Sequence, residues 1–246
     1  MNLWCLHGNL QLPTVWDLFT DQWKLPYPEN TATPVSLITP NFWDDDAQSF
    51  TAWTTSFCEQ VAEQSENKSN WLLGYSMGGR LALHAALHRP SLFRGVIVVG
   101  AHPGFPSIEQ RQRQQIADAH WAKRFREDQW DDILRDWDTL PVFGGRPNIS
   151  PRAESLFSRE KLASGFENFS KAQQAYLTPA LSSLTSPPIL FVSGEDDEKY
   201  SDIGASLEEA CTCISHVIIP NAGHRVPWEN PTAFVKKIQV FLDNTS

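Results

Sequence analysis

The chain has 246 residues, of which 41% are hydrophobic and 20% are charged, a balance typical of a globular protein with one sizeable core. Its 29 acidic and 20 basic residues give a net charge of −9, which argues against nucleic acid as a partner. No apolar run approaches the roughly 18 residues of a membrane span, and the N-terminus shows no basic leader or cleavage site. We therefore expect a cytoplasmic protein without membrane contact.

The first part of the chain alternates between short apolar runs and helix-forming segments. A strand is predicted from Leu3 to Leu6, ending at His7-Gly8, and a second from Val35 to Ile38. A helix from about Ser49 to Gln64 follows, since its apolar residues recur at helical spacing. The three aspartates just before this helix are interpreted as favourable N-terminal charge rather than as a metal site.

The next strand carries the most informative motif. The run Trp71 to Leu73 leads into Gly74-Tyr75-Ser76-Met77-Gly78, and a helix-forming segment follows at once. In this setting Gly-x-Ser-x-Gly indicates a nucleophile elbow, a tight strand-to-helix turn that presents a serine hydroxyl. Gly74 and Gly78 are expected where a Cβ would collide with a neighbouring element. The motif makes Ser76 the candidate nucleophile.

Beyond the elbow, the alternation is interrupted once. An apolar strand is predicted from Gly95 to Gly100, but 103–178 holds no good strand candidate and has eleven basic and eleven acidic residues. Strands resume at Pro188 to Gly194 and His216 to Pro220, before a C-terminal helix. Six strands joined by helices imply a parallel, doubly wound sheet. We expect a core of residues 1–102 and 179–246 with a helical cap, 103–178, over its catalytic edge.

The partners of the serine are sought in the order that hydrolases of this kind use, acid before histidine. Asp197 follows the strand that ends at Gly194, and His224 follows the strand that ends at Pro220. Ligands and chemistry collect at the carboxyl ends of parallel strands. Ser76, Asp197 and His224 are therefore the candidate catalytic triad.

The chain resembles a known family in segments spread over nearly its whole length. The segments are Gly74–Arg80 after the elbow strand, Asp118–Phe125 and Asp136–Phe143 in the predicted cap, Gly194–Tyr200 at the acid, and Ala222–His224 with Glu229–Pro231 at the histidine. They are similar to the 2-succinyl-6-hydroxy-2,4-cyclohexadiene-1-carboxylate synthases of menaquinone and phylloquinone biosynthesis. That resemblance implies an α/β-hydrolase fold with a helical cap after the fourth strand.

The resemblance also implies a reaction. By this resemblance, Ser76 of this chain, activated by His224 and Asp197, is expected to remove a proton from a carbon atom of the substrate. Pyruvate then leaves by elimination. The backbone N–H groups of Asn9 and Met77 are the expected oxyanion donors. Arginines are expected to pair with the carboxylates of the small polycarboxylate substrate.

Further substrate contacts are expected on the same basis. Arg80 is the best carboxylate partner, with a cap arginine, either Arg111 or Arg113, and a second one at Arg159. The other expected contacts are Tyr75, Trp137 and His7. Each has a simpler interpretation: Arg80 as a solvated helix residue, Tyr75 and Trp137 as packing, and His7 as a residue that orders the oxyanion loop.

The sequence departs from the family at Asn9, where an aromatic residue usually follows His-Gly. A backbone donor survives that change, although the shape of the site differs. No dinucleotide or phosphate-binding loop is present, and Cys211 and Cys213 lack companion ligands at zinc spacing, so no cofactor or metal is expected. A monomer or a weak homo-oligomer is expected.

Three functions compete on the sequence alone. The first is the carbon–oxygen lyase, and the second is a carboxylesterase or thioesterase that uses the same triad as acyl nucleophile. The third is a non-catalytic binding module, which requires a broken triad. Arg80 separates the first two, because a pocket for neutral acyl chains has no use for buried guanidinium groups.

Overall fold

The computed structural model describes residues 1–19, 35–65 and 68–245. Its centre is a parallel sheet in the order β2-β1-β3-β4-β5-β6. The six strands are β1 (Asn2–Leu6), β2 (Ser36–Ile38), β3 (Asn70–Tyr75), β4 (Gly95–Val99), β5 (Ile189–Gly194) and β6 (Ile214–Ile219). The predicted parallel sheet of six strands is confirmed. The chain adds β2 on one side of β1 and the later strands on the other side. The connections between parallel strands therefore pass over both faces of the sheet.

Continuous apolar strands suit this sheet because both of its faces are buried. In β3, Leu72 packs on one face while Trp71 and Leu73 pack on the other, and β4 alternates in the same way. The strands therefore show no alternation of apolar and polar residues.

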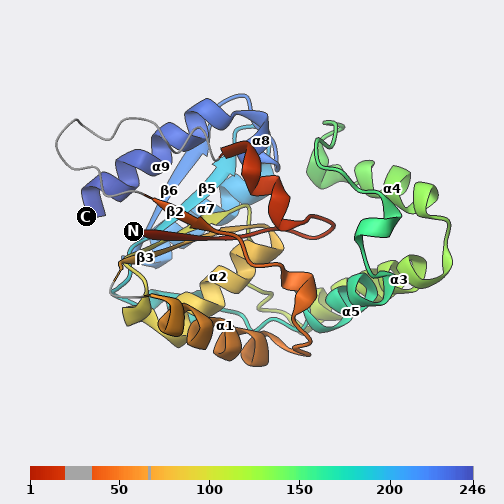
Figure 1. Cartoon of the computed structure of the whole chain (residues 1–246), viewed down its shortest axis with the longest axis horizontal. Helices are drawn as coiled ribbons and strands as arrows, with labels where there is room; N and C mark the ends of the chain where they lie inside the picture. The colour runs from red at the N-terminus through yellow and green to blue at the C-terminus, as the bar shows by residue number, and fades with distance from the viewer. Residues whose placement is uncertain (20–34, 66–67, 246) are drawn as a thin grey trace.

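Helices cover both faces (Figure 1). The core helices are α1 (Phe50–Gln64), α2 (Met77–His88), α7 (Glu198–Ala210), α8 (Val226–Glu229) and α9 (Pro231–Thr245). The larger apolar cluster unites α1, α2 and α7 with one face, and the smaller one joins α9 and the 3-10 helix η1 (Pro13–Phe19) to the other. Further 3-10 turns are η3 (Phe42–Asp44) and η4 (Pro90–Leu92). None of the described helices is long and apolar enough to cross a membrane.

Helices without strands fill the interval between β4 and β5. They are α3 (Ile108–Glu127), α4 (Trp130–Asp138), η5 (Pro141–Phe143), η6 (Glu154–Leu156), α5 (Arg159–Asn168) and α6 (Thr178–Ser182). In Figure 1, α3, α4 and α5 lie together at one end of the molecule, away from α9. The most extensive contact in this region is between α3 and α5.

Aromatic side chains hold these helices together. Trp121 and Phe125 of α3 pack against Trp137 of α4 and Phe166 of α5, with ring centroids 5.1 to 6.5 Å apart. Large rings bury much area at little entropic cost, which explains how a segment so rich in charge packs at all.

Element boundaries differ from the prediction in a few places. The helix after the elbow starts at Met77, inside the Gly-x-Ser-x-Gly motif rather than after it, because the turn at Ser76 leads directly into it. β2 starts at Ser36 rather than at Val35, and β6 starts at Ile214, which pairs with Ile189 of β5.

Candidate active site

The turn between β3 and α2 has the geometry of a nucleophile elbow. Ser76 has φ 52° and ψ −106°, a backbone conformation that is costly for a residue with a side chain. A Cβ on Gly74 would lie 2.3 Å from the carbonyl oxygen of Gly78, and one on Gly78 would lie 2.3 Å from that of Leu6. Both glycines are thus required where the spacing predicts them, since only glycine lets the helix approach the strands this closely.

Ser76, His224 and Asp197 come together although they lie far apart in the chain. The Ser76 Oγ lies 3.3 Å from His224 Nε2, and His224 Nδ1 lies 2.7 Å from Asp197 Oδ2. His224 and Asp197 are buried, at 3% and 6% exposure. The carboxylate therefore orients the imidazole so that Nε2 faces the hydroxyl, which is the arrangement a base-activated serine needs.

Aromatic rings fix the position of the imidazole. The rings of Tyr200, Tyr75 and Phe143 lie 4.8, 5.4 and 6.2 Å from that of His224. The backbone at Gly100 closes the remaining side, since a Cβ there would lie 2.9 Å from His224 Cε1. Phe143 belongs to η5, so the helical region between β4 and β5 contributes directly to the surroundings of the imidazole.

Hydrogen bonds to the His7 and Gln11 side chains stabilise the loop after β1. The His7 ring lies 3.0 Å from the Gly8 carbonyl oxygen and accepts a hydrogen bond from the Phe42 N–H, and the Gln11 side chain accepts one from the Gly8 N–H. His7 is 1% exposed and does not line the cavity described below, which favours its simpler interpretation as a residue that orders the loop. Burial lowers the pKa of His7, which keeps it neutral as a loop-ordering residue.

The expected oxyanion donors are Asn9, which lines the cavity described below, and Met77, the residue after Ser76. Within the described residues, the backbone N–H of Asn9 and that of Met77 make no hydrogen bond, while their neighbours Gly8 and Ser76 both donate one. Two N–H groups without a partner are free to receive charge that develops on a substrate oxygen.

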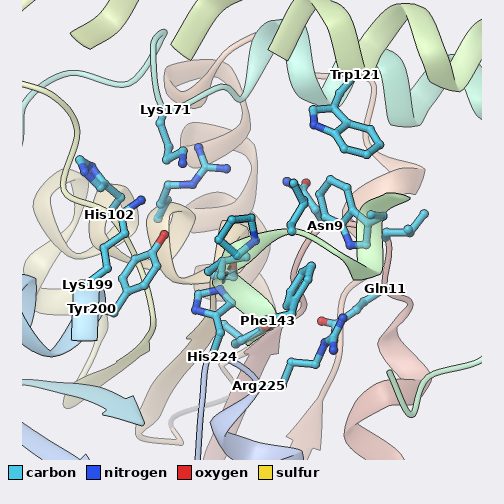
Figure 2. A pocket seen from close by; sticks show the side chains of 18 of the residues that line it. Asn9, Gln11, His102, Trp121, Phe143, Lys171, Lys199, Tyr200, His224 and Arg225 are labelled. Carbon is cyan, nitrogen blue, oxygen red and sulfur yellow. Dashed lines mark hydrogen bonds between the residues drawn. The ribbon is translucent and has the colours of Figure 1, made fainter. Parts of the chain in front are cut away.

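A cavity of about 620 Å³ opens above the serine, within the usual size of small-molecule sites. It lies between the sheet edge and the helices that follow β4, and Figure 2 shows side chains from both projecting into it. The predicted site residues that line it are Ser76, Asp197, His224, Asn9, Tyr75, Arg80 and Trp137.

Arg80 is buried rather than solvated, at 6% exposure. Its guanidinium donates a hydrogen bond to the Phe169 carbonyl and lies over the Phe50 ring, 5.6 Å from the centroid. Burial lowers the pKa of Arg80 to about 10, so it remains a cation at neutral pH. No acidic side chain among the described residues makes an ion pair with it.

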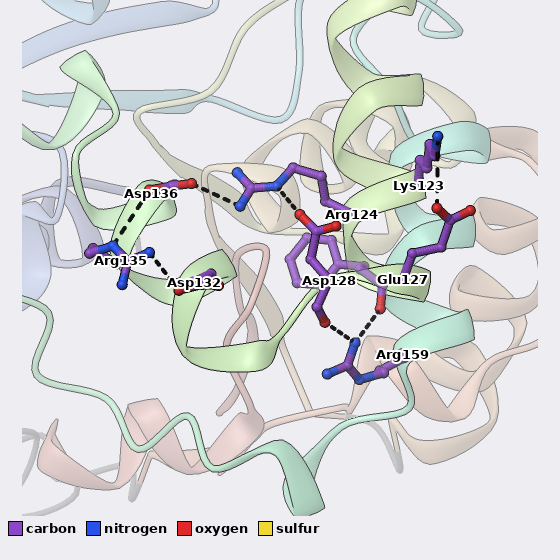
Figure 3. A network of polar contacts seen from close by, with 9 residues as sticks. Lys123, Arg124, Glu127, Asp128, Asp132, Arg135, Asp136 and Arg159 are labelled. Carbon is purple, nitrogen blue, oxygen red and sulfur yellow. Dashed lines mark hydrogen bonds and ion pairs between the residues drawn. The ribbon is translucent and has the colours of Figure 1, made fainter.

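The cap arginines expected to bind substrate lie elsewhere. Arg159 binds Glu154. It also donates to the carbonyl oxygens of Phe125 and Asp128, in the polar network shown in Figure 3. Arg113 is exposed, and Arg111 donates to the Phe105 carbonyl oxygen. None of these three arginines lines the cavity.

Other cations take their place in the cavity wall. Lys171, Lys199, Arg152 and Arg225 all line it. Lys171 carries no sequence signal, since it stands in an aperiodic stretch between α5 and α6. Arg225 could have been suspected because it follows His224 directly.

Arg225, which follows β6, and Arg152, in the region between β4 and β5, share one carboxylate of α4. Arg225 donates to Asp138 Oδ1 at 3.1 Å and to the Arg146 carbonyl oxygen, and its guanidinium lies 3.8 Å from the centroid of the Phe143 ring. Arg152 forms a bidentate pair with the same Asp138. Both guanidinium groups are thus paired with acceptors of the protein, whereas the ammonium groups of Lys171 and Lys199 make no ion pair or hydrogen bond with the described residues.

Metal ligands are not grouped in the part of the chain that the structure describes, where no set of three His, Cys, Asp or Glu side chains could hold an ion. Cys211 and Cys213 are buried and free.

Known proteins resemble this chain in sequence and in fold. The alpha/beta hydrolase family matches residues 5–237. The 2-succinyl-6-hydroxy-2,4-cyclohexadiene-1-carboxylate synthase of Escherichia coli is 37% identical over 177 residues, which cover 70% of this chain and 68% of the relative. The enzyme of that name from Escherichia fergusonii is 38% identical over the same shares.

Among solved structures, MenH from S. aureus superposes with a TM-score of 0.86 at 24% identity, covering 100% of this chain and 94% of the other. A malate-bound thermophilic esterase from Thermogutta terrifontis reaches 0.75 at 18% identity, covering 100% and 90%. These two structural similarities show the fold. The sequence relatives show which family within that fold the chain belongs to. The chain belongs to the alpha/beta hydrolase family and, within it, to the family of 2-succinyl-6-hydroxy-2,4-cyclohexadiene-1-carboxylate synthases.

Proposed function

We propose that the protein is a carbon–oxygen lyase. It eliminates pyruvate from 2-succinyl-5-enolpyruvyl-6-hydroxy-3-cyclohexene-1-carboxylate and releases 2-succinyl-6-hydroxy-2,4-cyclohexadiene-1-carboxylate. The relatives' name describes this product, and the contacts around Ser76 supply groups suited to making it.

The triad acts as a base toward carbon. His224 accepts the Ser76 proton, and the serine oxygen removes the proton from C2 of the ring, beside the succinyl carbonyl. The electron pair shifts through the ring double bond, and the C5–O bond to the enolpyruvyl group breaks. The imidazolium then returns its proton to the departing enolpyruvate, which becomes pyruvate, so serine and histidine end as they began. Asp197, 2.7 Å from His224 Nδ1, stabilises the imidazolium meanwhile.

Charge that forms on the succinyl carbonyl oxygen during proton removal is received by the backbone N–H groups of Asn9 and Met77. Preorganised donors of this kind contribute roughly 3 kcal/mol each to lowering a barrier. The proton of a carbon beside a carbonyl is weakly acidic, so an enolate without such donors would form too slowly.

The cationic wall of the cavity is the observation that favours this lyase over an esterase. Arg80, Lys171 and Lys199 line the same cavity as Ser76, and no acidic side chain among the described residues makes an ion pair with them. Arg80 is buried, and a buried cation without an anionic partner is costly unless a ligand supplies the opposite charge. A polycarboxylate does so, whereas a neutral acyl chain does not.

The test is to mix the purified protein with the enolpyruvyl precursor and to follow pyruvate with lactate dehydrogenase and NADH. We expect one pyruvate for each diene formed, with the diene followed by its ultraviolet absorbance. A protein that leaves the precursor intact would contradict the proposal.

The esterase remains the second candidate, because a strained serine next to a histidine–aspartate pair is also what acyl transfer needs. Hydrolysis of p-nitrophenyl butyrate measures that activity on the same preparation. Rapid ester turnover together with no pyruvate release would favour it.

The same proposal places the enzyme in the cytoplasm, in the synthesis of menaquinone or phylloquinone. It also assigns residues 103–178 the role of a cap and the remaining residues that of the catalytic core.

A further inference from the structure

One side of the cavity is lined by cations that come from separate parts of the chain. Lys171 follows α5, Lys199 lies in α7, and Arg80 lies in α2. Figure 2 shows Lys171, Lys199 and His102 gathered on one side, across the cavity from Asn9 and Gln11. Independent elements thus converge on one concentration of positive charge.

Lys171 has no charge partner within the part of the chain that the structure describes. Its ammonium makes no ion pair and no hydrogen bond there, in contrast to Arg80, which donates to the Phe169 carbonyl. The nearby acid, Asp118, already accepts hydrogen bonds from Gln114 and Ser170. The ammonium of Lys171 is therefore available to a ligand.

We propose that the Lys171 ammonium, supported by Arg80 and Lys199, binds a carboxylate of the substrate, and that Lys171 takes up a proton as the anion binds. The carboxylate assignment rests on the proposed function, since a polycarboxylate substrate supplies the anion. Lys171 thereby takes the role that the sequence resemblance gave to cap arginines, which lie outside the cavity.

The proton uptake follows from the surroundings of the ammonium. Burial and the charges of Lys199 and Arg80 lower the pKa of Lys171 to about 7, and Asp118 opposes them. His102 faces the same cluster with its pKa lowered to about 3, chiefly by burial, so it is neutral. Lys171 is thus only partly protonated at neutral pH in the empty cavity.

A bound carboxylate reverses this balance, because an opposite charge favours the ammonium and raises the pKa of Lys171. Binding then draws a proton from the solvent. The affinity for an anion is highest below pH 7 and falls as the pH rises through the pKa of the free lysine. The fall continues until the pH passes the higher pKa of the bound form.

Calorimetric titration with succinate tests this inference without requiring turnover. The wild type, Lys171→Gln and Lys171→Arg are titrated at pH 6.5, 7.5 and 8.5 in buffers of different ionisation enthalpy. Lys123→Gln is the matched control, because Lys123 is an exposed cap lysine outside the cavity and its substitution removes the same charge.

At pH 6.5 we expect Lys171→Gln to weaken succinate binding by roughly tenfold to a hundredfold, the usual effect of losing a charge-assisted hydrogen bond. Lys123→Gln should bind as the wild type does. Lys171→Arg should retain most of the affinity but lose the dependence on pH and on buffer, because arginine stays protonated.

Wild-type affinity in a folded Lys171→Gln protein would overturn the subsite, and a binding heat that is equal in all buffers would overturn the proton uptake. The pyruvate assay separates this inference from the proposed function. A protein that binds succinate through Lys171 but releases no pyruvate retains the subsite and loses the lyase assignment.

Discussion

The sheet core and the helical region between β4 and β5 are stabilised in different ways. In the core, apolar strands are buried on both faces and the helices cover them with aliphatic and aromatic side chains. Over its 20 residues, α3 buries only Asp118, Ala122 and Phe125, and the region is held by stacked rings and ion pairs instead. Such a region can change its surface charges without losing its fold.

The sheet core and the helical region also have different tasks in the proposed function. The core sets the positions of the reacting groups, since Ser76, Asp197 and His224 all follow strands of one sheet. The helical region contributes Lys171, Trp137 and Phe143 to the cavity, and so shapes what can bind. Changes in the core should therefore abolish turnover, and changes in the helical region should alter binding or stability.

Replacement of the nucleophile has the largest expected effect. Ser76→Ala should lower the rate of pyruvate release by roughly a thousandfold or more, because no other group can carry the proton. Rates measured with lactate dehydrogenase at saturating precursor provide the comparison, and the melting temperature should stay close to that of the wild type. A variant that retains a tenth of the activity would mean that Ser76 is not the base.

The second-largest effect is expected for Arg80→Ala. Its kcat/KM should be about a hundredfold lower than that of the wild type, because the buried guanidinium binds the polyanionic substrate. The loss should be far smaller for hydrolysis of p-nitrophenyl butyrate, if any is present, since that ester carries no charge. Equal losses for both substrates would point to a structural role for Arg80 instead.

A smaller effect, on stability, is expected where the two regions meet. Asp138→Ala leaves the guanidinium groups of Arg152 and Arg225 buried without their shared carboxylate, so unfolding should become easier by about 2–4 kcal/mol. Urea denaturation measures the change. Asp132→Ala is the control, because its exposed pair with Arg135 should contribute less than about 1 kcal/mol.

Arg159→Ala should have the least effect on turnover, with kcat/KM within about twofold of the wild type. Arg159 lies outside the cavity, where it contacts Glu154, the Trp130 ring and the carbonyl oxygens of Phe125 and Asp128. This variant is the matched control for Arg80→Ala, being the same substitution outside the cavity. A large loss of activity with unchanged stability would restore Arg159 as a substrate contact.

The core could be predicted from sequence because each of its signals is local. The elbow needs glycine at positions 74 and 78, and Asp197 and His224 each stand just past an apolar run, so chain order was enough to group them. Strand ends were predicted less well where the first residues carry no apolar pattern, as at Ile214.

The cavity wall could not be predicted in this way, because its residues are selected by packing between α3, α5 and the sheet edge. Lys171 stands in an irregular stretch, and only the fold turns it toward Arg80. Arg159 corresponds best to the second cap arginine of the family, at an offset of one position, and it donates to carbonyl groups at the end of α3. Sequence resemblance alone therefore does not identify which cations line the cavity.

The release of pyruvate from the enolpyruvyl precursor tests the central claim most directly. The account predicts that the wild-type protein forms pyruvate and diene in equal amounts, at a rate far above that of the precursor alone, and that Ser76→Ala does not exceed that background. A folded wild-type protein that forms no pyruvate above the background would contradict it.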